Sequence, residues 1–179
     1  MTEYGEQLNE NTVRFQRLLP GPIERVWAYL TESDKRAEWL CAGDAEACVG
    51  GHVDMHFHNA SLSGDDDIPR PEKYRDMPER VSFVGKVTRC EPPNLLAHTW
   101  EFEDEASEVC YELEAQGDKV LLTLTHRKLD TSETVLSVIT GWHSHLNLLE
   151  DVLAGVERRP IYKMQSELED EYGRQLWLG

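Results

Sequence analysis

The sequence predicts an α+β fold in which a curved antiparallel sheet of about six to seven strands wraps around one long helix near the C-terminus. Apolar and polar residues alternate in segments up to about residue 128, which is the period of strands. From Ser132 onward, apolar residues recur every three or four positions, which is the period of a helix. Most connections between the strand segments are short, and short connections join antiparallel strands.

The length and charge limit the function classes. The chain has 179 residues, which suit one domain, and a net charge of −16 from 18 basic and 34 acidic residues. Because this charge repels phosphate backbones and anionic lipids, we expect no nucleic-acid partner and no membrane partner. The four cysteines are scattered without a C-x-x-C pair, and residues 1–12 lack the apolar core of a signal peptide. We therefore expect a cytoplasmic protein with reduced thiols.

The N-terminal third predicts a strand and two short helices. Residues 1–11 are polar, and we expect a disordered lead. Alternating residues from 12 to 19 predict a strand that ends at Pro20-Gly21-Pro22, where Pro22 suits the first helical position. A short helix follows, and Thr31-Glu32-Ser33-Asp34 can cap a second one that reaches about Trp39. The apolar stripe of the first helix consists of Ile23, Val26, Trp27 and Leu30.

The next segment contains the most prominent histidines. Gly50-Gly51 predicts a turn between a short strand near 45–49 and a strand at 52–58. On the second strand Val53, Met55 and Phe57 share one face, and His52, Asp54, His56 and His58 share the other. These imidazoles could hold zinc, but solvent-facing strand positions are polar by default, so we expect no metal. Residues 59–80 predict a long acidic loop, either functional or a solvated insertion, and we favour the insertion.

Four further strands and the long helix complete the domain. The strands are expected at 81–91, 94–103, 107–116 and 119–128, with turns at Pro92-Pro93-Asn94 and Gln116-Gly117-Asp118. Thr131 or Ser132 caps the long helix, and Arg158-Arg159-Pro160 marks its end. We expect a domain at 12–159 and an amphipathic extension at 160–179, packed on the domain or on a second copy. The stripe of this extension consists of Ile161, Met164, Leu168, Tyr172 and Leu176.

Several motifs, taken in order, resemble those of one known family. They are Pro22, Glu24, Val26, Trp27 and Leu30; Trp39; Val49-Gly50-Gly51; Gly85-Lys86-Val87; Glu91-Pro92-Pro93-Asn94-Leu95; Thr99-Trp100; Leu124-Thr125-His126; and Gly141-Trp142. With these motifs, the chain resembles the START-like (SRPBCC, Bet v 1-like) superfamily. Within it, the chain is similar to the domain homologous to the C-terminal half of the heat-shock-protein-90 ATPase activator. The resemblance spans about residues 12–157 and implies a helix-grip fold.

The leading functional hypothesis is a small-molecule binding protein with an apolar cavity between the sheet and the long helix. His145 borders the inward stripe of the helix and is the candidate polar contact, whereas His126 more simply ends a strand. The alternatives are a co-chaperone-type interaction module and, third, a cyclase-like or hydrolase-like enzyme. No nucleophile motif is present, so we expect no catalytic residues and no cofactor, and we leave a homodimer open. The expected cavity walls are Val53, Met55, Phe57, Phe83, Trp142, His145, Leu146 and Leu149.

Overall fold

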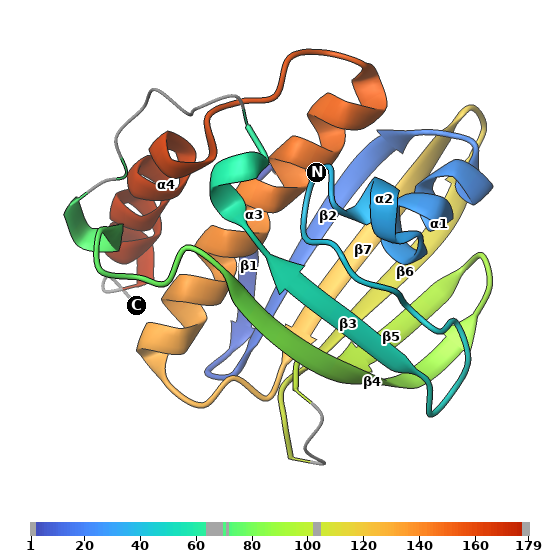
Figure 1. Ribbon diagram of the computed structural model, residues 1–179, viewed down its shortest axis with the longest axis horizontal. Helices are drawn as coiled ribbons and strands as arrows, with labels where there is room; N and C mark the ends of the chain where they lie inside the picture. The colour runs from blue at the N-terminus through green and yellow to red at the C-terminus, as the bar shows by residue number, and fades with distance from the viewer. Residues whose placement is uncertain (1–2, 64–69, 71, 102–104, 177–179) are drawn as a thin grey trace.

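A computed structural model describes residues 3–63, 70, 72–101 and 105–176. A seven-stranded antiparallel sheet with the strand order β1-β2-β7-β6-β5-β4-β3 wraps around the long helix α3 (Figure 1). This arrangement confirms the predicted α+β helix-grip fold. The strands are β1 (Glu6–Asn9), β2 (Thr12–Pro20), β3 (His52–Phe57), β4 (Val81–Glu91), β5 (Leu95–Thr99), β6 (Glu108–Gln116) and β7 (Lys119–Arg127). The helices are α1 (Ile23–Thr31), α2 (Ser33–Arg36), α3 (Ser132–Ala154) and α4 (Ile161–Leu176), with 3-10 turns η1 (Asn59–Ser61) and η2 (Glu72–Tyr74).

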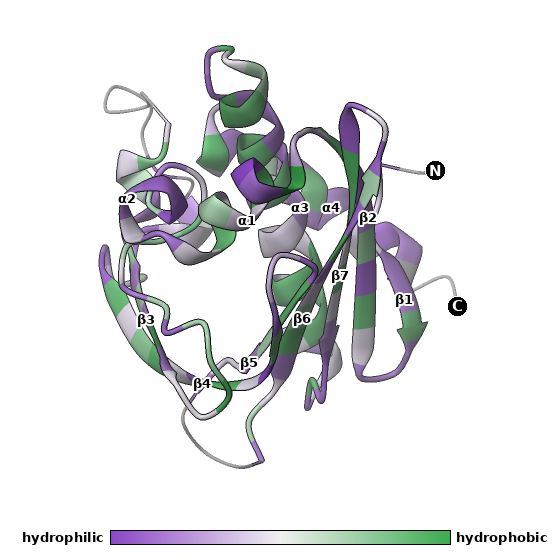
Figure 2. Ribbon diagram, turned by 90° about the vertical axis from the view of Figure 1, so that its right-hand side faces the viewer, coloured by the Kyte–Doolittle hydropathy of each residue, from purple (hydrophilic) through white to green (hydrophobic). Residues whose placement is uncertain are grey.

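The register of the sheet sets the inward face. β2 and β7 pair from Val13 opposite His126 to Pro20 opposite Lys119. Alternate residues of both strands are buried, and Figure 2 shows the resulting bands of hydropathy along β2. His126 belongs to the buried set of β7, together with Leu122 and Leu124. The buried face therefore follows the alternation of apolar residues in these strands, and His126 continues it at the end of β7.

Helix α3 fills the concave side of the sheet. Its N-cap is Thr131, whose hydroxyl accepts a hydrogen bond from the Thr134 amide, so the first of the two predicted caps is used. The helix ends at Ala154, before the predicted Arg158-Arg159-Pro160, because Gly155 adopts a left-handed conformation with φ 69°. Glycine adopts this conformation without a Cβ clash and commonly terminates helices.

Helix α4 packs against the outer side of α3. Ile161, Leu168 and Tyr172 are buried there, as the predicted stripe requires, and Met164 is half-buried. The side chain of Leu176 and residues 177–179 lie outside the described residues. The Tyr172 hydroxyl accepts a hydrogen bond from the Gly5 amide at 2.7 Å, so the two ends of the described chain meet on this side. No helix within the described ranges is long and apolar enough to cross a membrane.

Several boundaries differ from the expectations. Residues 6–9 form the edge strand β1 where a disordered lead was expected. All four side chains are exposed, so no apolar alternation marks the strand; backbone pairing with β2 and an exposed ion pair between Glu6 and Arg14 hold it. The strand expected near 45–49 is reduced to single bridges, Ala42 with His56 and Ala45 with Val53. β5 stops at Thr99, and α2 stops at Arg36, although a turn continues to residue 40. Pro22 is the N-cap of α1 and not its first helical residue, so the helix begins at Ile23, one residue later than expected.

Candidate functional site

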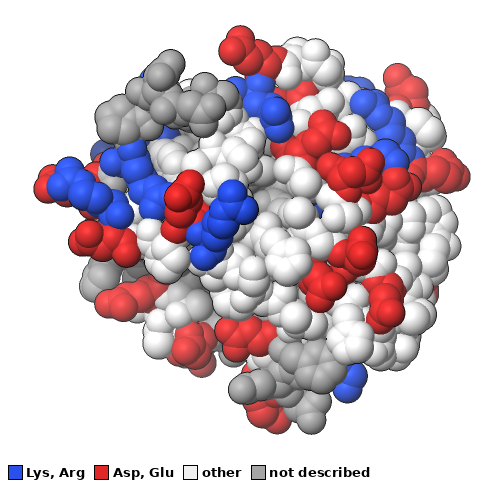
Figure 3. All heavy atoms as spheres, viewed as in Figure 1, with Lys and Arg blue, Asp and Glu red and all other residues white. Residues whose placement is uncertain are grey.

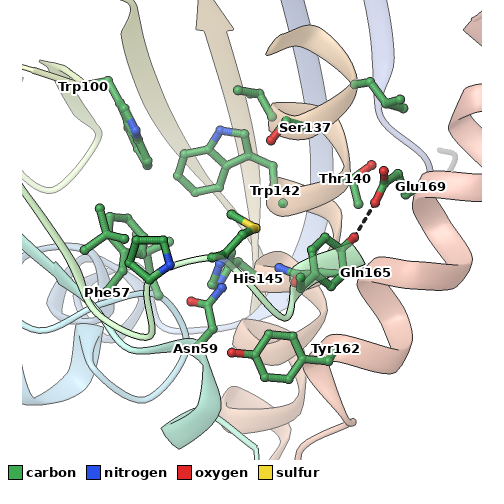
Figure 4. A pocket seen from close by; sticks show the side chains of 18 of the residues that line it. Phe57, Asn59, Trp100, Ser137, Thr140, Trp142, His145, Tyr162, Gln165 and Glu169 are labelled. Carbon is green, nitrogen blue, oxygen red and sulfur yellow. Dashed lines mark hydrogen bonds between the residues drawn. The ribbon is translucent and has the colours of Figure 1, made fainter. Parts of the chain in front are cut away.

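A pocket of about 580 Å³ lies where β3 ends and β4 begins. Residues of α3 and the start of α4 surround it (Figure 4), and Arg70 and part of the segment 72–79 complete its lining. Because β3 and β4 are antiparallel, with Phe57 opposite Val81, the last residue of one strand and the first of the other reach the same end of the sheet. Pockets of about 300–1,000 Å³ are typical of small-molecule sites. The pocket therefore has the dimensions of a ligand site.

Aromatic side chains form the wall on the sheet side. Phe57 packs edge-on against Phe83, with ring centroids 6.1 Å apart, and contacts Trp100 at 5.7 Å. Trp100 in turn meets Trp142 of α3 edge-on at 5.5 Å. Edge-to-face pairs of this kind stabilise the arrangement beyond the area they bury. The four rings form one continuous apolar surface that an aromatic or aliphatic ligand could contact.

His145 of α3 is one of two buried histidines beside this wall. Its Nδ1 lies 2.8 Å from the carbonyl oxygen of Trp39, and its ring contacts Phe57 at a centroid distance of 6.4 Å. A carbonyl can only accept, so Nδ1 carries the hydrogen, and burial lowers the pKa of His145 to about 4. The neutral ring therefore has its lone pair on Nε2. His145 is suited to accept a hydrogen bond from a ligand, and it is a weak base.

His126 also reaches the pocket, but its two nitrogens are occupied. The Trp142 indole N–H donates to Nδ1 at 3.0 Å, so Nε2 carries the hydrogen and donates to the Ser107 hydroxyl at 2.9 Å. In a nucleophile–base pair the histidine nitrogen must instead accept the hydroxyl proton. Burial also lowers the pKa of His126 to about 3. This geometry favours a structural role for His126 over a catalytic one.

Residues 70–79 cover the side of the pocket that faces α4. The Tyr74 hydroxyl donates to the Glu169 carboxylate of α4, and burial together with this bond raises the pKa of Tyr74. The Arg70 guanidinium lies 5.3 Å from the ring centroid of Tyr162 and donates to the carbonyls of Tyr74 and Met77. The described part of the 59–80 segment therefore builds the site, which favours the functional interpretation of this loop. Residues 64–69 and 71 of the predicted loop lie outside the described residues.

The structure separates the eight predicted wall residues into two groups. Phe57, Phe83, Trp142 and His145 line the pocket. Val53, Met55, Leu146 and Leu149 do not line it; they are at most 1% exposed and lie in the packed core. The four core residues sit farther along β3 and α3, where the sheet and the helix pack directly against each other. The pocket lies between the sheet and α3, where β3 ends and β4 begins.

The polar face of β3 has local partners. His52 contacts Glu46 at 3.3 Å, His58 contacts Glu79 at 3.1 Å, and His56 contacts the Ser82 hydroxyl at 3.0 Å. Among the residues that the structure describes, no three His, Cys, Asp or Glu side chains are placed to share a metal ion. The face thus consists of separate polar pairs.

Sequence reasoning missed several residues of the site and misplaced one histidine. Trp100 follows β5 directly, and its place in the Thr99-Trp100 motif was the available signal. Tyr74 and Tyr162 come from the loop and the C-terminal helix, which no strand or helix period of the main domain links to the cavity. The sequence places His143 off the inward stripe of the long helix and predicts that it points outward. In the structure it is 4% exposed, and its Nδ1 lies 2.8 Å from the Tyr172 hydroxyl. It is buried because α4 covers this side of α3.

Carboxylates exceed cations around the pocket. Glu79, Glu133 and Glu169 line it, against Arg70 as the single Lys or Arg in the lining that the structure describes. Figure 3 shows acidic side chains spread over the face that carries β3 and α4. The local charge has the same sign as the net charge of −16. Both charges disfavour an anionic ligand.

A long helix held in a curved antiparallel sheet, with a pocket beside the helix, defines the START-like class of helix-grip proteins. The model of the family "Activator of Hsp90 ATPase homolog 1-like protein" matches residues 20–154, and the chain belongs to this family. The match extends from the end of β2 to the end of α3. It confirms the resemblance seen in the sequence motifs.

Solved structures agree with this assignment. A Bordetella parapertussis protein, solved by NMR in solution, is 38% identical with a TM-score of 0.78, over 95% of this chain and 88% of that chain. CalU16 from Micromonospora echinospora is 20% identical with a TM-score of 0.63, over 91% and 86% of the two chains. A conserved Enterococcus faecalis protein of unknown function is 20% identical with a TM-score of 0.64, over 95% and 88%. The last two show the fold alone, and no curated protein matches the chain.

Proposed function

We propose that the protein binds a small, mostly apolar molecule in the pocket beside Trp142. The observation that carries this proposal is the continuous aromatic wall of Phe57, Phe83, Trp100 and Trp142 around a space of about 580 Å³. Ligand sites are typically apolar with a few placed polar groups, and His145 supplies one such group. The tautomer of His126 and the low pKa of His145 favour binding without catalysis.

A thermal-shift screen with neutral aromatic compounds tests this proposal. Specific binders should raise the unfolding midpoint, because a ligand that binds only the folded state stabilises it. The pocket variant Trp142→Ala should weaken the shift. The matched control is Leu146→Ala, which also truncates a buried residue of α3 but one that does not line the pocket. The control should retain the ligand-induced shift even though its own midpoint is lower.

Two outcomes contradict the proposal. The first is a screen in which no compound raises the midpoint, together with native mass spectrometry that finds no retained small molecule. The second is an equal loss of the shift in Trp142→Ala and Leu146→Ala, which means that general destabilisation explains the loss.

The family match favours a second candidate, a co-chaperone-type interaction module, because the family is named after an activator of the Hsp90 ATPase. A measured increase in the ATPase rate of an Hsp90 chaperone on addition of the protein supports this candidate. Retention of that increase in Trp142→Ala separates it from ligand binding in the pocket.

A further inference from the structure

Two hydrogen-bond acceptors of the pocket, Asn59 Oδ1 and His145 Nε2, have no protein donor in the part of the chain that the structure describes. Asn59 Oδ1 is buried and has no hydrogen-bond partner among the described residues. His145 donates through Nδ1 to Trp39, which leaves the lone pair of Nε2 as its remaining hydrogen-bonding group. Both residues line the pocket. A buried acceptor without a donor costs free energy, and a ligand that supplies the donor recovers it.

The two acceptors lie on one wall. Asn59 begins η1, two residues after Phe57, and the Phe57 ring contacts the His145 ring. Figure 4 shows the side chains of Asn59 and His145 beside Phe57. A single polar group at the edge of a ligand that packs on the aromatic wall would therefore lie close to Asn59 and His145.

Other polar groups of the pocket either have protein partners or, like the Ser137 and Tyr162 hydroxyls and the Gln165 amide, can donate as well as accept. The Thr140 hydroxyl is unpartnered and its residue is 4% exposed, but a hydroxyl can donate as well as accept. The Glu169 carboxylate is an acceptor and already receives the Tyr74 hydroxyl. The Arg70 guanidinium, which is the cation of the lining, donates to two backbone carbonyls.

We propose, on the basis of the ligand-binding function above, that the pocket selects an aromatic molecule with a neutral hydrogen-bond donor, a hydroxyl or an amino group, at one edge. The aromatic body packs against Trp100 and Trp142. The donor is directed to the acceptors Asn59 Oδ1 and His145 Nε2. The excess of carboxylates over cations disfavours an aromatic acid of the same size.

Calorimetric titration with three matched probes tests this selection. 2-Naphthol carries the donor, 2-methoxynaphthalene keeps the ring and the oxygen but lacks the donor, and 2-naphthoate carries a negative charge. We expect 2-naphthol to bind on the order of tenfold more tightly than 2-methoxynaphthalene, because only 2-naphthol satisfies the buried acceptors. We expect 2-naphthoate to bind the most weakly of the three.

The variant Asn59→Ala tests whether Asn59 causes the preference for 2-naphthol over 2-methoxynaphthalene. It should reduce the ratio of the two affinities by weakening 2-naphthol while leaving 2-methoxynaphthalene unchanged. Ser61→Ala is the matched control, since Ser61 belongs to the same turn but does not line this pocket. Circular dichroism checks that both variants are folded. If a variant does not fold, the comparison of the three probes on the unmodified protein still tests the donor preference.

Each other result overturns a defined part of the proposal. Equal affinities for 2-naphthol and 2-methoxynaphthalene refute the donor preference and leave ligand binding intact. Tightest binding of 2-naphthoate refutes the charge argument. An affinity ratio that Asn59→Ala does not change refutes the role of Asn59. Failure of all three probes to bind refutes this inference together with the proposed function.

Discussion

Trp142 joins the pocket to the core, and its truncation is the sharpest test of the packing described above. The side chain is 4% exposed and meets Trp100, Tyr111 and His126 at centroid distances of 5.5, 5.9 and 6.2 Å. Its indole N–H also donates to His126 Nδ1. Trp142→Ala removes both the ring contacts and the donor.

The two contributions can be estimated separately. Truncating a buried Trp to Ala typically costs about 3–5 kcal/mol of unfolding free energy. Because Trp142 borders an existing pocket, water can enter part of the vacated space, so we expect a value near the lower end, about 3 kcal/mol. Trp142→Phe keeps a buried ring and mainly leaves His126 Nδ1 without its donor, which costs about 1–3 kcal/mol.

Urea denaturation followed by far-ultraviolet circular dichroism measures both losses without depending on the fluorescence of the replaced residue. The slope of the unfolding free energy against urea should be unchanged, which shows that each variant loses stability while keeping a comparable fold. A loss below about 1 kcal/mol for Trp142→Ala refutes the burial argument. An unchanged free energy for Trp142→Phe refutes the contribution of the hydrogen bond to His126.

Three further changes test other contacts. Burial lowers the pKa of His126 from 6.5 to about 3, so the unfolded chain takes up the proton first, and this residue by itself should lower stability by up to about 1.4 kcal/mol per pH unit as pH drops below about 6.5. Burial also lowers the pKa of His98, His143 and His145 to about 4, so His126→Gln should reduce the slope of stability against pH in urea titrations without abolishing it. Tyr74→Phe removes the bond to Glu169 and should speed tryptic cleavage in residues 70–79, and an unchanged cleavage rate contradicts the covering role of this segment. Tyr172→Phe removes the partner of His143 and should lower the unfolding free energy by about 1–3 kcal/mol in urea. A loss within experimental error argues against this contact.

The fold was readable because its main elements carry strong periodic signals. The stripe that begins at Val135 specifies α3, and the alternation around Leu122 specifies β7. An element that buries no apolar side chain carries no such signal: all four side chains of β1 are exposed, and the strand is held by main-chain pairing and one exposed ion pair. The end of α3 was misplaced because the left-handed conformation of Gly155 stops the helix before the more conspicuous Pro160.

The site was only half readable for a different reason. Alternation along β3 identifies the inward residues Val53, Met55 and Phe57, but it does not tell which of them lie in the packed core and which line the pocket. Their depth depends on what covers each end of the strand: Met55 is 1% exposed in the core, whereas Phe57 at the strand end is half-buried and faces the pocket. Tyr74 and Tyr162 reach the site through tertiary packing of a loop and a separate helix, which a periodic pattern does not encode.

The hydrogen bond between Gly5 and Tyr172 has a consequence for biosynthesis. During synthesis, β2 meets its neighbour β7 only after β3 to β6 have been made. Helix α4 leaves the exit tunnel later still, and until it docks, the outer side of α3 with His143 is uncovered in the nascent chain. Ribosome-stalled chains ending before residue 161 should therefore engage nascent-chain chaperones more than the released protein does.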